Sequence, residues 1–440
     1  MNTLERLKDS IGHLTNDPRL QVLLIAFAFG AFIEGAAGFG TPVAVAAAML
    51  AGLGFSPFYA AALCLLANTA PVAFGSIGIP VITLAVTTNL PLDSLSAAVG
   101  RICAPVSLII PAYIIVVMGG WKSLLAVFPA AAVCGITFAG TQFAVSNYVG
   151  PQLTDILASL AAILALVVLT RVWLPRDEFV FGEHHVRGEV TIHAGGRIVS
   201  AWMPYALLVV LILLWGYKLL QVHLNAATIT FPWPGLHNLV QRMPPVVGAA
   251  SPYGAMYTFN WLSASGTACL IAAILGAIVS GLSMRQFGRV FGQTVKQLLL
   301  AELTYAAVLG LAFLMNYCGA TGTLGLAFAA TGAMFPVFSA LLGWLGVFLT
   351  GSDTSANALF GTLQVVTAGK LGLSPVLMAA ANSAGGVMGK MISLASIAVA
   401  GAATSMKPAD EGRLFRFTQA APAAFKTASN NRIENLHPSP

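Results

Sequence analysis

The residues best suited to chemistry are a few acids, amides and hydroxyls that interrupt long apolar stretches. The first such interruption is the segment from Glu34 to Pro42, which combines one acid with three glycines and a proline. Glycine permits unusual backbone dihedrals and proline frees a carbonyl group. This composition predicts a broken or re-entrant segment inside the protein. Close packing of small residues along a continuous helix is the alternative.

A second isolated acid stands in the segment Gly351-Ser352-Asp353-Thr354-Ser355-Ala356-Asn357, between two apolar runs. We interpret it as the tip of a hairpin at membrane depth, although an ordinary aqueous loop would look similar. Such a tip presents hydroxyls, amides and backbone N–H groups, which can hold a carboxylate as helix N-termini do. The two segments therefore predict a site for a small anion. Its residues are Gly35, Gly38, Gly40, Thr41, Gly351, Ser352, Thr354, Ser355 and Asn357, with Glu34 and Asp353 as candidate proton carriers.

Two further motifs place side-chain donors where a helical ladder could be interrupted. These motifs are Asn68-Thr69-Ala70-Pro71 and Asn382-Ser383-Ala384-Gly385-Gly386. Asn and Ser/Thr followed by Pro or Gly are typical of helix breaks, and we expect both breaks to face the two tips. Simple kinks are the alternative. Asn68, Thr69, Asn382 and Ser383 join the predicted substrate site.

Lys390 is the one cation deep in the last apolar stretch, eight residues after Asn382. A lone lysine at membrane depth is costly unless it is paired or hydrated. We predict that Lys390 binds the carboxylate of the substrate, and that Asp353 or Glu34 pairs with it otherwise. A lysine that snorkels to the membrane interface is the alternative.

These features recur in the same order along the chain. Leu53-Gly54-Phe55-Ser56-Pro57 returns as Leu371-Gly372-Leu373-Ser374-Pro375, with an isolated acid 18 or 19 residues upstream and an Ala-Asn-Thr/Ser-Ala tetrapeptide downstream. Internal repeats with Gly/Pro-broken segments at corresponding positions indicate a secondary transporter. The sequence leaves open whether the repeats are inverted or parallel.

The elements that position these residues are apolar spans. Of the 440 residues, 58% are hydrophobic and 8% are charged, whereas about a quarter of an ordinary soluble domain is charged. A span needs about 20 mostly apolar residues. The sequence predicts an all-α polytopic membrane protein with spans near 20–52, 58–88, 97–118, 122–147, 152–173, 202–221, 264–284, 297–316, 320–349, 350–369 and 373–403.

We divide the chain into a first transport repeat (1–170), a charged loop with connecting spans (171–296), a second transport repeat (297–406) and a polar tail (407–440). Loop residues His184, His185 and His193 suggest a metal site, but a solvated loop is the better interpretation. The five cysteines show no metal-ligand spacing. We expect no cofactor and no metal.

The net charge of +6 does not favour nucleic acid as a partner, because the basic residues lie at the edges of apolar runs. Three clusters fit cytoplasmic anchors: Arg6, Lys8 and Arg19; Arg285, Arg289 and Lys296; and Lys407, Arg413 and Arg416. The first apolar run continues past Glu34 to Leu53, so we interpret it as a retained span rather than a signal peptide.

Four motifs together closely resemble the L-lactate permease family of bacterial proton-coupled carriers, which includes glycolate permeases. They read IEGAAGFGTPVA, LLANTAPVAFGSIGIP, GWLGVFLTGSDTSANALFG and NSAGGVMGKMIS, and the similarity runs from about Leu4 to Arg416. The resemblance implies import of L-lactate, and of D-lactate and glycolate, with protons across the cytoplasmic membrane. It also implies inverted repeats with re-entrant hairpins at Glu34–Pro42 and Gly351–Asn357, and an intramembrane lysine at Lys390. Family members usually carry further spans at both ends, so the chain is expected to be a shortened member.

Other functions stay open beside this one. One alternative is a cation-coupled carrier of another small organic anion, such as a dicarboxylate moved with sodium. A second is a truncated homologue that does not transport. An ion channel or a sensor is a further alternative. An intramembrane enzyme is disfavoured, because the sequence holds no HExxH or GxSxG motif and every histidine except His13 and His437 lies between Glu183 and His237.

Overall fold

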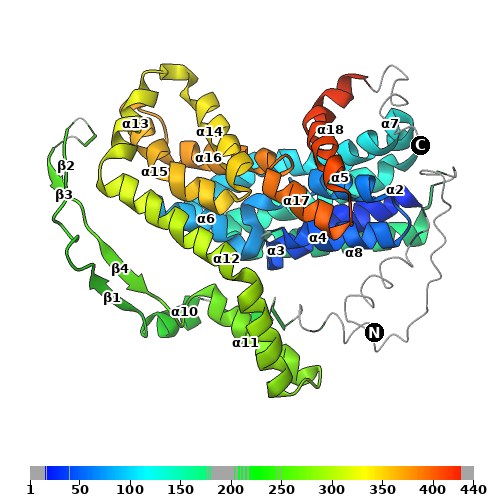
Figure 1. Cartoon of the computed structure of the whole chain (residues 1–440), viewed down its shortest axis with the longest axis horizontal. Helices are drawn as coiled ribbons and strands as arrows, with labels where there is room; N and C mark the ends of the chain where they lie inside the picture. The colour runs from blue at the N-terminus through cyan, green and yellow to red at the C-terminus, as the bar shows by residue number, and fades with distance from the viewer. Residues whose placement is uncertain are drawn as a thin grey trace. The chain divides into compact units, whose positions relative to one another are not determined.

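The computed structural model describes residues 17–38, 40–175, 218–244 and 249–427, together with Thr15, Asp177, Phe179, Val246, Val247 and isolated positions between 203 and 215. Almost every described element is a helix (Figure 1). The first part of the chain forms α2 (Pro18–Gln21), η1 (Val22–Phe29), α3 (Gly30–Ala36), α4 (Thr41–Gly52), α5 (Pro57–Ala67), η2 (Val72–Phe74), α6 (Gly75–Thr88), α7 (Leu92–Tyr148), η3 (Pro151–Leu153) and α8 (Thr154–Val172).

The later part contains two short antiparallel ladders. Strand β1 (Ile229–Pro232) pairs with β4 (Met256–Phe259), and β2 (Gln241–Arg242) pairs with β3 (Ser251–Pro252). The helices are α10 (Lys218–Asn225), α11 (Ser265–Val279), α12 (Met284–Tyr317), α13 (Ala320–Ala329), η4 (Gly332–Met334), α14 (Phe335–Thr350), α15 (Asp353–Leu371), α16 (Pro375–Lys390), α17 (Leu394–Ala403) and α18 (Pro408–Thr427).

Several of these helices can cross a membrane. Within the described residues, five are long and apolar enough, or up to seven if each of two bent pairs counts as one span. Large apolar side chains such as Leu125 and Leu164 are exposed on their outer faces, which is the arrangement that lipid favours. These findings agree with the predicted all-α polytopic membrane protein. Residues 180–202 of the predicted charged loop, which include His184, His185 and His193, lie outside the described residues, as do Arg6, Lys8 and the tail beyond Thr427.

Helix α7 is too long for one crossing. Its 57 residues would extend about 85 Å at 1.5 Å per residue, whereas a bilayer core is about 30 Å thick. The backbone leaves helical geometry at Gly119 and Gly120, where Gly120 has φ 73°. This break falls between the predicted spans 97–118 and 122–147, so α7 contains both.

Helix breaks occur at most of the predicted places. Helix α3 ends at Ala36 and α4 begins after Gly40, whose φ is 81°. Gly351, with φ 72°, separates α14 from α15. Helix α5 ends before Asn68, and the two arms Pro57–Ala67 and Val72–Thr88 are bent by 68°. The predicted breaks at Glu34–Pro42 and at Asn68–Pro71 are confirmed. The interruption at Gly351 fits a hairpin tip and an ordinary loop equally, so the hairpin tip stays a prediction.

The predicted break at Asn382–Gly386 is wrong. These residues lie inside the continuous helix α16, and the interruption comes at residues 391–393, before α17. Glycines within a helix lower its stability but do not end it when neighbouring elements pack closely against them. Here Gly385 packs against the backbone of Ala340, and Gly389 packs against the backbone of Trp344.

The repeated pentapeptides form the same helix–turn–helix connection. In the first copy the N–H of Phe55 donates to the carbonyl of Leu50, and in the second the N–H of Leu373 donates to that of Ala368. This bond to the residue five positions earlier is typical of a helix that ends on a left-handed glycine. Ser56 and Ser374 then cap α5 and α16 through their hydroxyls. The two pentapeptides therefore repeat each other in structure as well as in sequence. The inverted orientation of the two repeats stays a prediction.

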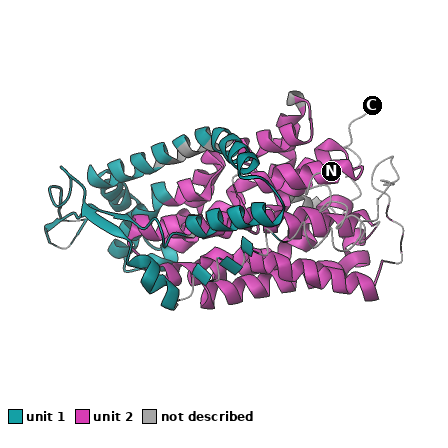
Figure 2. Ribbon diagram, turned by 90° about the horizontal axis from the view of Figure 1, so that it is seen from below, with its two compact units in different colours: residues 1–7, 193–336, 358–378 teal, residues 8–192, 337–357, 379–440 magenta. Residues whose placement is uncertain are grey.

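The chain divides into two compact units that interleave in sequence (Figure 2). Unit 1 contains residues 1–7, 193–336 and 358–378, and unit 2 contains residues 8–192, 337–357 and 379–440. Every predicted site residue belongs to unit 2. The predicted segment boundaries at 170, 296 and 406 stay predictions.

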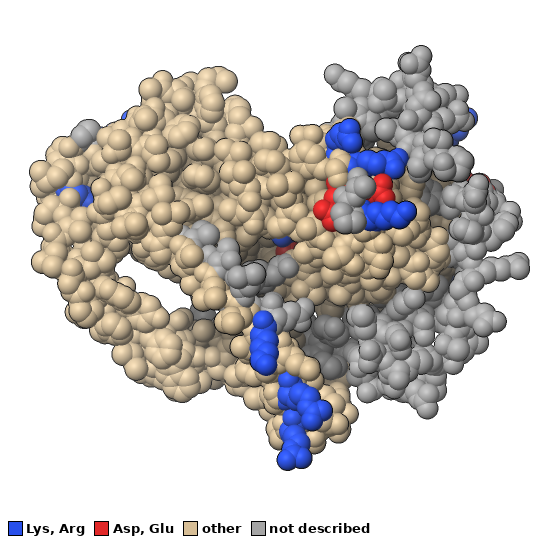
Figure 3. Space-filling view, viewed as in Figure 1, with Lys and Arg blue, Asp and Glu red and all other residues tan. Residues whose placement is uncertain are grey.

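Two of the predicted basic clusters are exposed. On the face shown in Figure 3, charged side chains gather along the first part of α12 and on α18. Arg285, Arg289 and Lys296 lie on α12, and Arg413 and Arg416 lie on α18. Such exposed cations at the ends of apolar segments are typical of membrane anchors.

Candidate functional site

Glu34 lies on α3, one turn before the break that separates α3 from α4. Its side chain is 4% exposed and its Oε2 has no hydrogen-bond partner. Gly75, at the start of α6, faces the carboxyl group so closely that a Cβ there would lie 2.6 Å from Oε1. Asn68 also lies beside Glu34, but both atoms of its amide lack a partner with hydrogen-bond geometry. The hydroxyl of Thr69, fully buried, is unpartnered as well.

A second buried acid stands next to Glu34. Asp155 lies in the first turn of α8, is 0% exposed, and has two carboxylate oxygens without a hydrogen-bond partner. A Cβ added to Gly35 would lie 3.0 Å from the Cβ of Asp155. Asp155 is not among the site residues predicted from the sequence. Its isolation between two long apolar runs was the signal that could have found it, as it found Glu34.

Asp353 is held in a hydrogen-bonded network on α15 and α16. Its Oδ2 accepts bonds from the hydroxyl of Ser383 at 2.7 Å and from the amide of Asn357 at 3.2 Å, while its Oδ1 has no partner. The Asn357 amide also donates to Ser383 at 3.0 Å, and its carbonyl accepts from Asn382 at 3.0 Å. All four side chains are at most 3% exposed. Gly386 leaves the room that the Asp353 carboxyl group occupies.

Lys390, the last residue of α16, is buried at 6% exposure. Its ammonium donates a hydrogen bond of 2.6 Å to the carbonyl of Gly351. It also acts electrostatically on the carboxyl groups of Glu34 and Asp353. The predicted cation therefore lies at the break before α15 and in electrostatic range of both predicted acids. The predicted ion pair with Asp353 or Glu34 is not formed among the described residues, because the ammonium donates to the Gly351 carbonyl instead.

The predicted site residues from the first half of the chain and those from the second half meet inside unit 2. The amide of Asn357 donates to the carbonyl of Pro80 in α6 at 3.2 Å. The hydroxyl of Ser76, in the left-handed stretch that opens α6, donates to the carbonyl of Ala37 at the first break. Cys103 on α7 lies in electrostatic range of both Asp353 and Asp155. The structure therefore brings both acids, both motifs and the lysine into one buried polar region.

The remaining predicted residues shape the two breaks. Gly38 and Gly40 have positive φ, and the hydroxyl of Ser76 occupies the space that a Cβ at Gly38 would need. Ser352 caps α15 by accepting from the N–H of Ser355, and Thr354 and Ser355 are buried in its first turn. Thr41, in contrast, is exposed at the start of α4, and the structure does not bring its side chain into the polar region.

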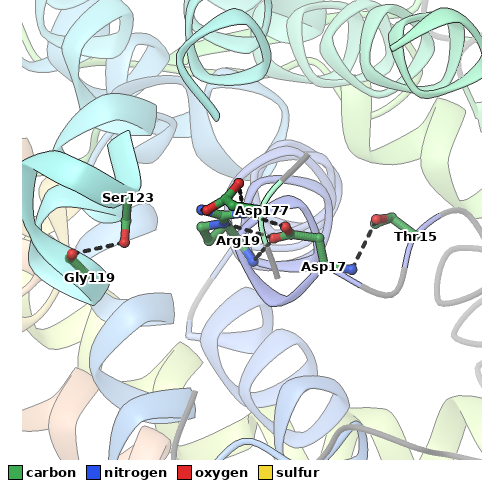
Figure 4. A network of polar contacts seen from close by, with 6 residues as sticks. All are labelled: Thr15, Asp17, Arg19, Gly119, Ser123 and Asp177. Carbon is green, nitrogen blue, oxygen red and sulfur yellow. Dashed lines mark hydrogen bonds and ion pairs between the residues drawn. The ribbon is translucent and has the colours of Figure 1, made fainter. Parts of the chain in front are cut away.

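A charged network fixes the start of the first span (Figure 4). The buried guanidinium of Arg19 pairs with Asp17 at 2.7 Å and, through two bonds, with Asp177 beyond the end of α8. The ring of Phe179 covers the guanidinium at 4.8 Å. The hydrogen bonds from Arg19 lower the pKa of the Asp177 carboxyl group. This network explains how an arginine is buried at the beginning of an apolar helix.

Unit 1 holds a separate cavity of about 640 Å³, lined by residues of β2, α12, α13 and α15 that include Arg242, Asn316 and Lys370. None of the predicted site residues lines it. The predicted site therefore lies in unit 2 and not at this cavity.

Chemically, the polar region of unit 2 combines one cation, three acids and several amide and hydroxyl groups in apolar surroundings. The ammonium and amide donors can bind a carboxylate, and an acid buried in such surroundings can take up and release a proton. Among the described residues, no group of three or more His, Cys, Asp or Glu side chains has the arrangement of a metal site.

Comparison with known proteins identifies the family. The family model described as L-lactate permease matches residues 1–427. The chain is 45% identical to the L-lactate permease of Bacillus subtilis (strain 168) and 44% identical to the glycolate permease GlcA of Escherichia coli (strain K12). It is also 45% identical to the L-lactate permease of Escherichia coli (strain K12). Each alignment covers 94% of this chain and 77% of the relative.

No solved structure matches the chain significantly. The family match extends over almost all of the sequence, and the matched relatives are named as permeases rather than as enzymes. With its apolar, broken helices, the chain therefore belongs to the L-lactate permease family and is a multi-pass protein of the bacterial cytoplasmic membrane.

Proposed function

We propose that this chain is a secondary transporter, not an enzyme, that imports L-lactate together with protons, and that also accepts D-lactate and glycolate. The names of its relatives, lactate and glycolate permeases at about 45% identity, support this substrate class. The observation that carries the proposal is the buried ammonium of Lys390 in electrostatic range of Glu34 and Asp353. A buried cation beside buried acids is suited to binding an anion and a proton together.

In this proposal Lys390 binds the carboxylate of the substrate. Asn68, Thr69, Asn382 and Ser383 supply hydrogen bonds, and the substrate is surrounded by the break at Gly35–Gly40 and by Gly351–Asn357, which contains the second break and the start of α15. The unpartnered amide of Asn68 and hydroxyl of Thr69 support this role, because buried polar groups without partners are costly unless a ligand satisfies them. Glu34 and Asp353 take up the proton.

The charge balance explains why a proton accompanies the substrate. Lactate is a monoanion at neutral pH, because a carboxyl group titrates near pH 4. A membrane potential that is negative inside opposes entry of one negative charge by about 2.3 kcal/mol per 100 mV. One accompanying proton cancels this charge. Accumulation is then driven by the pH difference across the membrane, at about 1.4 kcal/mol per pH unit.

The test is uptake of labelled L-lactate by proteoliposomes that contain this chain, with an inward proton gradient imposed and then collapsed by a protonophore. We expect accumulation that depends on the gradient and competition by glycolate and D-lactate. Competition by succinate with a requirement for sodium would indicate a dicarboxylate carrier instead. Flux that never exceeds equilibrium would indicate a channel. Either result would contradict the proposed function.

A further inference from the structure

Asp155 is the buried acid for which the proposed mechanism has no role. It is 0% exposed in the first turn of α8, and both carboxylate oxygens lack hydrogen-bond partners. Placing a charged carboxylate in apolar surroundings without a partner is costly. An ionisable residue at membrane depth is therefore expected to have a function.

The groups that face Asp155 come from two neighbouring helices. Helix α3 brings Glu34 within electrostatic range, and Gly35 on the same helix packs against the Asp155 Cβ and the Ile156 backbone. Helix α7 brings Gln142, whose amide lies beside the carboxyl group, and the thiol of Cys103. Among these described groups, Glu34 and Cys103 are titratable, and Lys390 acts on the pair through Glu34.

Glu34 and Asp353 differ in a way that matters for proton transfer. Asp353 Oδ2 accepts hydrogen bonds from Ser383 and Asn357, and such bonds hold a carboxylate in place. Glu34 Oε2 and both oxygens of Asp155 lack a partner with hydrogen-bond geometry, although the amides of Asn68 and Gln142 lie beside these two acids. Two neighbouring carboxyl groups in a site of low polarity cannot both be charged without a large penalty, so they share protons as a unit.

We infer that Glu34 and Asp155 form a buried carboxyl pair that carries the transported proton. This inference rests on the proposed function and revises one part of it: Asp155, and not Asp353, shares the transported proton with Glu34. Without substrate the pair holds one proton, and its single negative charge balances the ammonium of Lys390. When the substrate carboxylate neutralises Lys390, a hydronium ion of the aqueous phase gives its proton to the remaining carboxylate oxygen and becomes water, and the pair becomes neutral. The same O–H bond breaks after the site opens to the other side. Asp353 keeps the same negative charge in the state without substrate and in the state with substrate bound.

The experiment separates proton coupling from substrate binding. Proteoliposomes of the full chain carry wild type, Asp155→Asn, Asp155→Glu or Asp93→Asn, and two rates are measured for each. Exchange of internal for external labelled lactate requires no net proton transfer, whereas accumulation driven by a proton gradient requires it. Asp93→Asn removes one exposed carboxylate at the start of α7 and serves as the matched control.

We expect Asp155→Asn to keep lactate exchange within about twofold of wild type and to lose at least about tenfold of the gradient-driven accumulation. Asp155→Glu should restore part of the accumulation, and Asp93→Asn should behave as wild type. Wild-type accumulation in Asp155→Asn would overturn the inference. Loss of both activities in Asp155→Asn, with neither restored by Asp155→Glu, would also overturn it, because the residue would then be structural. Absence of lactate exchange in the wild type would instead refute the proposed function.

Discussion

The ammonium of Lys390 donates a hydrogen bond of 2.6 Å to the carbonyl of Gly351, which joins the end of α16 to the break before α15. Gly351 has φ 72°, and a Cβ there would lie 2.9 Å from the Cβ of Ala395, so only glycine fits this position. A carbonyl group carries no net charge. The bond therefore positions the cation and leaves its charge, and two of its three N–H donors, available to an anion.

This geometry predicts the effect of removing the charge. Lys390→Met keeps the length of the side chain and loses a charge-assisted hydrogen bond of about 1.5–3 kcal/mol, so we expect KM for lactate to rise about tenfold to a hundredfold. Lys122→Met removes an exposed lysine of α7 and should leave KM unchanged. Concentration-dependent uptake measures both variants. An unchanged KM in Lys390→Met would show that another group binds the carboxylate.

The carboxyl groups of Glu34 and Asp353 occupy space that is open only because Gly75 and Gly386 have no side chain. This predicts which glycines can be replaced by alanine. A Cβ at Gly75 would lie 2.6 Å from Glu34 Oε1, and one at Gly386 would collide with Asp353 Oδ1. Gly140 and Gly369 are helical glycines with nothing within 4 Å of an added Cβ. Alanine favours a helix by about 1 kcal/mol over glycine, so alanine at these two control positions should be neutral or stabilising.

We therefore expect Gly75→Ala and Gly386→Ala to reduce proton-driven lactate uptake severalfold, while Gly140→Ala and Gly369→Ala retain it. Uptake normalised to the amount of protein in the membrane distinguishes lost transport from lost expression. Equal uptake in all four variants would show that the carboxyl groups move freely, and that the space beside these glycines has no role in transport.

The positions of several helix breaks could be predicted from the sequence, because polar residues and glycines are rare inside apolar runs unless the helix is interrupted there. Glu34–Pro42 and Gly351 combine acids with glycines where lipid would favour an uninterrupted helix, and both proved to be breaks. The repeated Leu-Gly-x-Ser-Pro motif predicted corresponding positions, since each of its residues has a defined role in ending one helix and capping the next.

Other parts depend on tertiary packing that a sequence does not display. The motif Asn382–Gly386 has the composition of a break but stays helical, because its glycines let α14 approach closely. Residues Val22–Phe29 form a π-helix, fully inside the protein, although they read as an ordinary apolar run. Asp155 was passed over although Gly150 and Pro151 interrupt the helix shortly before it. Only the fold brings it to Glu34.

The Asn357 side chain joins three elements, and this predicts a loss of stability when it is removed. Its amide donates to Pro80, Asp353 and Ser383, and its carbonyl accepts from Asn382. Asn357→Ala leaves these buried groups without their partner, at a cost of about 1–3 kcal/mol for each group that stays unsatisfied. We expect a thermal midpoint in detergent several degrees below wild type.

The control for this prediction is Asn225→Ala, which removes an exposed amide with a single side-chain bond of 3.3 Å to Gln221. Its midpoint should stay within about one degree of wild type, because most exposed substitutions change stability by less than about 0.5 kcal/mol. If the two variants unfold at the same temperature, the network around Asn357 does not hold unit 2 together.

The pair of Arg19 and Asp177 predicts a dependence of stability on pH. Hydrogen bonds from Arg19 hold the pKa of Asp177 below its ordinary value in the folded protein, so the folded state binds fewer protons than the unfolded chain in that pH range. The contribution is therefore fully present above the unfolded pKa of about 4 and is lost as the pH falls through the folded pKa. Asp177→Asn should lower the thermal midpoint at pH 7.

The difference between Asp177→Asn and wild type should shrink as the pH falls below about 4, where wild-type Asp177 also becomes neutral. Ser123→Ala is the matched control from the same region, since it removes an uncharged hydrogen bond to the Gly119 carbonyl (Figure 4). Its effect on the midpoint should be the same at every pH. A difference for Asp177→Asn that stays constant between pH 7 and the acid limit would show that the Asp177 carboxylate contributes through packing and not through its charge.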